Sequence, residues 1–352
     1  MAVVSDEARA GVRLTPALVM PSLTALLLAT VLVSVTLGRY DLSVPQVAAI
    51  LLDNVIPFET VTWEPVQELV VEQVRLPRIL AAVVIGFGLA VSGAALQGMF
   101  RNPLVDPGII GVTSGAGFGG TLAILLGLTG SVLLAIAFAF GMGSILMVKM
   151  LATVRRRTSM LTLVLAGVVV SAFFTAAISV AKLLADPFQK LPAITYWLMG
   201  SIASSDYADV LLISVAVLPA SLVIYLLRFQ INILSLGEEK ARALGTPVGL
   251  VQWMILIATA VISAGVVATS GIIGWVGLVI PHAARALVGA SHQRLLPASG
   301  IIGAIYLLLV DDIARTATTS EIPIGIITAL IGVPVFALIL RRIHAHGGWT
   351  NY

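Results

Sequence analysis

Long apolar runs without Asp, Glu, Lys or Arg dominate this chain. About 20 apolar residues are needed to cross a bilayer as a helix. Six runs are close to that length, and each predicts one transmembrane helix. They are Pro16–Gly38, Ile79–Phe100, Thr158–Ala181, Val210–Leu227, Leu295–Val310 and Ile322–Leu340.

Two further runs, Pro107–Val148 and Ala243–Ala284, are twice as long and predict two helices each. Glycines supply the turns, at Gly127–Ser131 in the first run and near Ser270–Gly274 in the second. The stretch Leu191–Ser205 is too short to span and predicts a re-entrant or interfacial segment. We therefore predict an all-α membrane bundle of ten transmembrane helices, folded as one domain over residues 1–352.

Composition agrees with a polytopic membrane protein. Hydrophobic residues make up 59% of the chain and charged residues only 11%, whereas about a quarter of the residues of a soluble domain are charged. The chain has no cysteine, which excludes disulfides and thiolate metal sites. Its surroundings are expected to be lipid, and no nucleic-acid partner is expected.

The basic residues predict the orientation in the membrane. Ten spans place both termini on one side, and most Lys and Arg then fall on the side of the termini, as at Arg155–Arg157. Basic loops stay in the cytoplasm. We therefore predict a bacterial inner-membrane protein with both termini in the cytoplasm.

Two absences limit the function. No charged residue lies in the middle of a predicted span, although ion-coupled secondary carriers usually need one. No phosphate-binding G-x-x-x-x-G-K-[ST] loop and no H-E-x-x-H metal motif is present. We expect no catalytic residue, no bound metal and no cofactor on this chain; any ATP would be hydrolysed by another subunit.

A short charged segment, Leu234–Gly245, separates two long apolar runs. Ser235 and Glu238 have the spacing of a capping box, and Glu238 and Arg242 can pair one turn apart. Gly245 is suited to end the helix. A helix of about two to three turns is not stable alone. It is either an ordinary amphipathic loop helix or one that docks on a partner.

Four motifs follow one another along the chain. They are Arg75-Leu-Pro-Arg78, Arg101-Asn-Pro-Leu-Val-Asp-Pro-Gly108, the segment SLGEEKARALG, and Gly274-Trp-Val-Gly-Leu-Val-Ile-Pro-His-Ala-Ala-Arg285 with Glu321-Ile-Pro-Ile-Gly325 and Gly332-Val-Pro334 behind it. Together they resemble the FecCD family, the permease subunits of ABC importers for iron chelates, haem and cobalamin, and the resemblance runs from about Leu37 to Arg342. The resemblance implies the fold of a type II ABC importer permease. It also implies a homodimer, two ATP-binding cassette ATPases that hold ATP and Mg, and a substrate-binding protein outside.

The resemblance implies roles for three groups of residues. The loop 229–248 would hold the coupling helix, which contacts the ATPase through Ser235, Leu236, Glu238, Glu239, Lys240, Arg242 and Leu244. Outside, Arg75, Arg78 and Arg315 would dock the binding protein; the alternatives are interfacial snorkelling or pairing with Asp311 and Asp312. A cytoplasmic gate would use Asn102, Leu104, Thr158 and Ser159, which also suit a turn and a helix N-cap.

The cargo is the open question. Because iron complexes are the commonest cargo of such permeases, we expect haem or a ferric siderophore. Cobalamin is second and an oxyanion such as molybdate third. A secondary carrier is the alternative from another class. His282 is interpreted as a helix-end hydrogen bonder, with haem ligation as the less favoured reading.

Overall fold

The computed structural model describes residues 16–53, 63–154, 157–158 and 160–345. Seven of its helices are long and apolar enough to cross a membrane, and three shorter apolar helices accompany them. These helices follow the predicted apolar runs, so the all-α membrane bundle is confirmed.

The elements have the following bounds. The structure contains α1 (Pro16–Thr36), α2 (Val44–Leu52), α3 (Pro65–Leu69), the π-helical turn Val70–Arg75, α4 (Leu76–Phe100), a 3₁₀ turn Pro107–Ile110, α5 (Val112–Leu125), α6 (Gly130–Ala152), β1 (Thr153–Val154), β2 (Arg157–Thr158), α7 (Met160–Leu184), α8 (Lys190–Leu198), α9 (Tyr207–Leu226), α10 (Arg228–Leu234), α11 (Glu238–Ala243), α12 (Val248–Ser270), α13 (Val276–Val288), α14 (His292–Thr316) and α15 (Ile324–Ala345).

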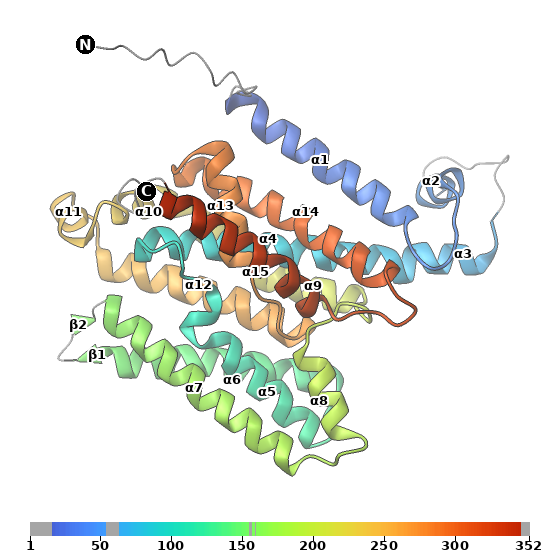
Figure 1. The fold of residues 1–352 in the computed structure, drawn as a ribbon, viewed down its shortest axis with the longest axis horizontal. Helices are drawn as coiled ribbons and strands as arrows, with labels where there is room; N and C mark the ends of the chain where they lie inside the picture. The colour runs from blue at the N-terminus through green and yellow to red at the C-terminus, as the bar shows by residue number, and fades with distance from the viewer. Residues whose placement is uncertain (1–15, 54–62, 155–156, 159, 346–352) are drawn as a thin grey trace.

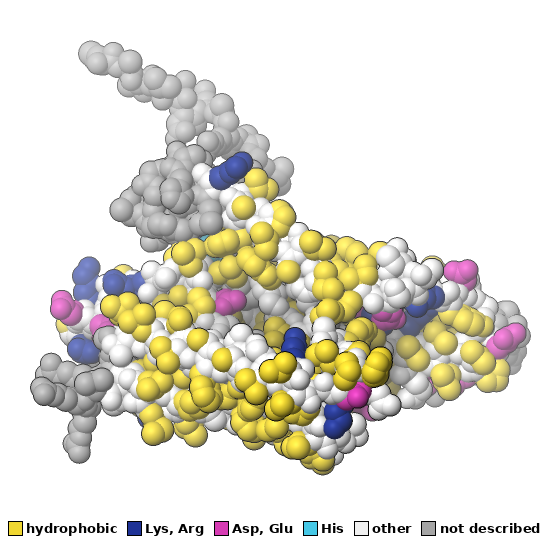
Figure 2. All heavy atoms as spheres, turned by 60° about the horizontal axis from the view of Figure 1, so that its bottom comes forward, with side chains coloured by type: hydrophobic (Ala, Val, Ile, Leu, Met, Phe, Trp, Pro, Cys, Tyr) yellow, Lys and Arg dark blue, Asp and Glu magenta, His cyan; other side chains and the backbone are white. Residues whose placement is uncertain are grey.

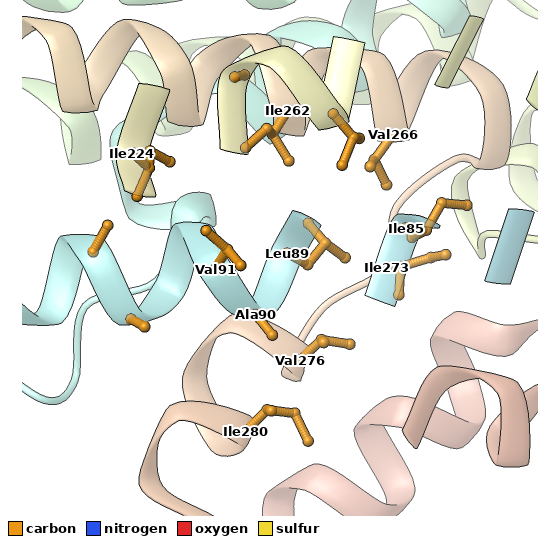
Figure 3. Packing of buried hydrophobic residues seen from close by; sticks show 14 of the residues in the cluster. Ile85, Leu89, Ala90, Val91, Ile224, Ile262, Val266, Ile273, Val276 and Ile280 are labelled. Carbon is orange, nitrogen blue, oxygen red and sulfur yellow. The ribbon is translucent and has the colours of Figure 1, made fainter. Parts of the chain in front are cut away.

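Helix α4 is the centre of the bundle, packed against α14, α9, α13 and α12. In Figure 1 α1 lies along the outside of α14, and α5, α6 and α7 form the opposite side. Figure 3 shows the core around α4, where Leu89 and Val91 approach Ile262 of α12 and Ala90 faces Val276. The interior is therefore a close-packed apolar core.

The bundle has two polar ends, which we name by the elements they hold. The α11 end carries α10, α11 and the β1–β2 pair, and the α2 end carries α2 and α3. In Figure 2 apolar side chains cover most of the face shown, and charged side chains gather mainly towards its ends. This is the surface expected of a protein that crosses a bilayer.

Glycine allows α4 to touch its neighbours backbone to backbone. A Cβ atom at Gly86 would lie 2.2 Å from the carbonyl oxygen of Gly303 in α14. One at Gly93 would lie 1.9 Å from the carbonyl oxygen of Gly277 in α13. Small residues at such contacts are the usual means by which membrane helices pack closely.

We expect Gly93→Ala to lower the free energy of unfolding by about 1–3 kcal/mol, because the methyl group forces α4 and α13 apart. The matched control is Gly143→Ala in α6, where an added Cβ meets no atom within 4 Å. There the gain in helix propensity stabilises by about 0.5–1 kcal/mol. Thermal unfolding followed by tryptophan fluorescence measures both, and equal shifts would contradict the close contact.

The predicted glycine turns are confirmed. Gly127 lies between α5 and α6 and Gly130 is the first residue of α6, both with positive φ, and Gly271 follows α12 with φ of 68°. A side chain at Gly271 would lie 2.1 Å from the carbonyl oxygen of Trp197, so this turn also holds the end of α8. The predicted short segment at Leu191–Ser205 is the nine-residue α8 with an irregular continuation.

Helix α2 was not predicted, although a local signal exists. Ser43 and Gln46 form a capping box at its N-terminus. The backbone N–H of Ser43 donates to Gln46 Oε1 at 3.1 Å, and the N–H of Gln46 donates to Ser43 Oγ at 3.4 Å. The S-x-x-Q spacing could have revealed this helix.

Candidate functional site

The charged segment contains one short helix, α11, and a second short helix, α10, ends at the first residue of the segment. Helix α10 ends at Leu234, and α11 begins at Glu238 after Gly237, which has φ of 110°. The predicted capping box is wrong: Ser235 is the C-cap of α10, and its Oγ donates to the carbonyl oxygen of Asn232 at 2.6 Å. The left-handed backbone of Gly237 is needed for the sharp turn between the helices.

The predicted ion pair and helix stop of this segment are confirmed, and its ATPase contact stays a prediction. Arg242 donates to Glu238 Oε2 at 3.0 Å, one helical turn apart, and Gln252 of α12 donates to Glu238 Oε1 at 3.1 Å. The helix ends with Gly245 at φ of 78°, whose N–H donates to the carbonyl oxygen of Arg242. Glu238 therefore fixes α11 to the start of α12.

This segment presents apolar side chains that the chain itself leaves uncovered. Leu236 is 53% exposed and Leu244 is 63% exposed, whereas Ala241 between them is fully buried. A hollow of about 490 Å³ lies beside them and is lined by Met99, Phe100, Arg101, Met160, Leu234, Leu236, Gly237, Glu238, Glu239, Lys240 and Arg242. Exposed leucines that are surrounded by charged side chains are typical of a protein-binding surface.

The structure brings two of the three predicted docking arginines into one buried ionic cluster at the α2 end. The Arg78 guanidinium contacts Asp311, with Nη2 2.9 Å from Oδ1, and its Nη1 donates to both oxygens of Glu321. Arg315 pairs with Asp312 and donates to the carbonyl oxygen of Ser34 at 2.7 Å. The cluster therefore joins α1, α4, α14 and the segment before α15.

Arg75 lies near the cluster and is bound differently. Its Nη1 donates to the carbonyl oxygens of Val35 at 2.6 Å and Thr36 at 3.1 Å, and Nη2 donates to that of Tyr40. The carbonyls of Val35 and Thr36 belong to the end of α1, which has no further helical turn to supply N–H donors, and Tyr40 follows four residues later. Arg75 thus closes the C-terminus of α1.

None of the three arginines lies free at the surface, and their docking role stays a prediction. Arg75, Arg78 and Arg315 are each at most 5% exposed. The pairing with Asp311 and Asp312, which the sequence left open, is observed. The guanidinium groups of these arginines therefore bind to partners within the chain. Among the ion pairs of this cluster, Glu321 is the most exposed residue, with 27% of its side chain accessible.

The predicted gate residues do not form one described site. Asn102 Oδ1 accepts the N–H of Leu104 at 2.9 Å in the turn after α4, and Leu104 is 41% exposed. The backbone of Thr158 pairs with Thr153 in the two-stranded ladder. Ser159 lies outside the described residues. The turn interpretation of Asn102 is thus observed, and the gate stays a prediction.

Two histidines bind the backbone or an amide. His282 lies in the middle of α13, not at a helix end as predicted, and its Nε2 is 3.1 Å from the carbonyl oxygen of Pro103 in the turn after α4. His292, which sequence reasoning missed, is buried beside Asn232 of α10. No group of three or more His, Cys, Asp or Glu that could hold a metal occurs among the described residues.

Comparison with known proteins agrees with these features. Residues 26–342 match the model of the FecCD transport family. The chain is 46% identical to the molybdate import system permease protein MolB of Haemophilus influenzae, over 92% of this chain and 96% of that protein. It is 39% identical to the hemin transport system permease protein HmuU of Yersinia pestis, over 78% of this chain and 84% of that protein.

A solved structure has the same fold. It is described as an inward-facing metal-chelate type ABC transporter, is 43% identical, and superposes with a TM-score of 0.84 over 93% of this chain and 99% of its own. The family match covers nearly all of the described bundle, including α11 and the buried ionic cluster. This chain is therefore an ABC importer permease of the inner membrane that belongs to the FecCD transport family.

Proposed function

We propose that this permease imports molybdate or a related tetrahedral oxyanion. The observation that carries the proposal is the similarity to the molybdate permease, which extends over 92% of this chain, against 78% for the hemin permease. The sequence alone favoured an iron complex, and the comparisons do not confirm that choice.

The surfaces of α7 and α15 support a path for an anion. No residue from Leu161 to Val180 in α7, or from Ile326 to Leu338 in α15, is charged. Thr175 and Ser179 of α7 are exposed, and each hydroxyl now donates to a backbone carbonyl of its own helix. Hydroxyl groups can rotate to donate to an oxyanion. A path without fixed charge lets the anion leave again.

In the proposed assembly two copies of the chain pair around this path. Two ATPase subunits, which hold ATP and Mg, contact α11, and a substrate-binding protein docks at the α2 end, outside the cell. Exposed apolar side chains on α7 and α15, such as Leu165 and Leu330, would lie at this interface in the proposed assembly. The α11 end with both termini faces the cytoplasm.

An iron complex is the second candidate. The solved relative is described as a metal-chelate type transporter, and the hemin permease is 39% identical. The same uncharged faces suit a large, partly apolar chelate. Cobalamin and a secondary carrier mechanism rank below both.

Metal analysis of cells separates these candidates. Cells lacking the gene should lose most of their molybdenum in medium poor in molybdate, with iron and cobalt unchanged, and the wild-type gene should restore it. A gene with Glu238→Ala and Arg242→Ala should restore less. Loss of iron with normal molybdenum would reject the oxyanion and favour the second candidate, and loss of cobalt would favour cobalamin.

A further inference from the structure

A side chain from α10 caps the N-terminus of α14. Asn232 Oδ1 accepts the backbone N–H of His292, the first residue of α14, at 2.9 Å and lies 2.8 Å from His292 Nδ1. The first N–H groups of a helix have no partner within it. Ser291, at the N-cap position, makes no side-chain cap. Asn232 therefore takes the role of the missing local cap.

The His292 ring is enclosed at this junction. His292 is 4% exposed, and a Cβ atom at Gly98 of α4 would lie 2.2 Å from its Nε2 atom. The same Cβ would lie 2.8 Å from Ile231 of α10. The ends of α4, α10 and α14 thus meet at one point, with no space for independent movement.

Asn232 is directly connected to the charged segment Leu234–Gly245. Its carbonyl oxygen accepts the hydroxyl of Ser235, the C-cap of α10. Leu236 and Gly237 then donate to carbonyls of the last turn of α10. Helix α11 begins at Glu238, directly after this turn. Because no flexible linker separates the two helices, we expect a displacement of α11 to move α10 as well.

Helix α14 continues from this junction to the other end of the bundle. It has 25 residues and is about 37 Å long. It packs on α4 through the backbone contact of Gly86 and Gly303. Near its far end Asp311 and Arg315 belong to the buried ionic cluster. The α4–α14 pair therefore joins the α11 end to the α2 end as one body.

We propose that Asn232 is a positioning residue that transmits movement of α11, through His292, to the α4–α14 pair and the ionic cluster at the α2 end. The inference rests on the proposed function, since it assumes that an ATPase moves α11. It assigns the coupling of hydrolysis to the opening of the outer end to partly buried Asn232 and buried His292, neither of which is among the residues predicted to contact the ATPase.

Reconstitution of the whole importer in vesicles tests this role, with molybdate, ferric siderophore, haem and cobalamin as probes. Asn232→Ala should lower the cargo imported per ATP hydrolysed about tenfold, because both hydrogen bonds to His292 are lost. Asn232→Asp keeps both acceptors and should restore the ratio to within about twofold of wild type. Gln230→Ala is the matched control on α10, because Gln230 Oε1 makes no hydrogen bond.

The outcomes distinguish this inference from the proposed function. Equal import per ATP in wild type, Asn232→Ala and Gln230→Ala would overturn the role of Asn232 alone. Wild-type vesicles that import none of the four cargos would reject the proposed function and this inference with it. If Asn232→Ala does not assemble, His292→Ala decides: it keeps the backbone cap, and an unchanged ratio would overturn the role.

Discussion

Replacing Asp311 with alanine is expected to lower the free energy of unfolding by about 3–5 kcal/mol, because it removes the buried carboxylate that Arg78 and Arg315 share. Asp311 is fully buried and contacts Arg78 at 2.9 Å and Arg315 at 3.8 Å. Removing one partner of a buried pair costs far more than the pair itself contributes, since the remaining charge cannot be hydrated. Thermal unfolding of purified protein measures the loss.

The chain offers a matched control on its surface. Arg242 and Glu238 form an ion pair of similar length, 3.0 Å, but the Arg242 side chain is 64% exposed. Arg242→Ala should cost only about 0.3–0.5 kcal/mol, as exposed helical pairs do. The double variant Arg78→Met, Asp311→Leu should recover much of the stability. A similar loss for Asp311→Ala and Arg242→Ala would contradict the burial of the cluster.

The ionic cluster also marks the limit of sequence reasoning. The spans could be predicted because bilayer thickness fixes their length and charge-free runs mark them. Pairing of Arg78 with Asp311 was one of several open alternatives, and Glu321 was not considered. These partners are more than 230 residues apart, and no local pattern encodes such contacts. Only the packing of α4 on α14 decides between a docking arginine and an internal one.

The short helices show the same division. The Glu238–Arg242 pair and the stop at Gly245 follow from local spacing, and both are observed. The start of α11 was misplaced because Ser235 has two competing positions, N-cap of one helix or C-cap of the helix before it. Asn232 and His292 carried no signal, since their hydrogen bond depends on how α10 meets α14.

Replacing both exposed leucines of the charged segment Leu234–Gly245, Leu236→Asp and Leu244→Asp, is expected to weaken binding of the proposed ATPase partner at least about thirtyfold. An apolar anchor at the centre of an interface contributes about 2 kcal/mol or more, which is a factor of about thirty. Both side chains are more than half exposed in the chain, so their loss costs the permease little of its own packing. Co-purification and titration with the ATPase measure the effect.

The control must separate loss of the contact from loss of the fold. Leu250 lies just beyond α11, in the first turn of α12, and is 62% exposed. Leu250→Asp adds the same charge near the segment but outside the hollow that Leu236 lines. It should leave ATPase binding within about twofold of wild type, because Leu250 lies outside the charged segment Leu234–Gly245 that holds both contact leucines. Equal weakening by Leu250→Asp and Leu236→Asp would show that charge repulsion at this end, and not the leucine contact, governs the association.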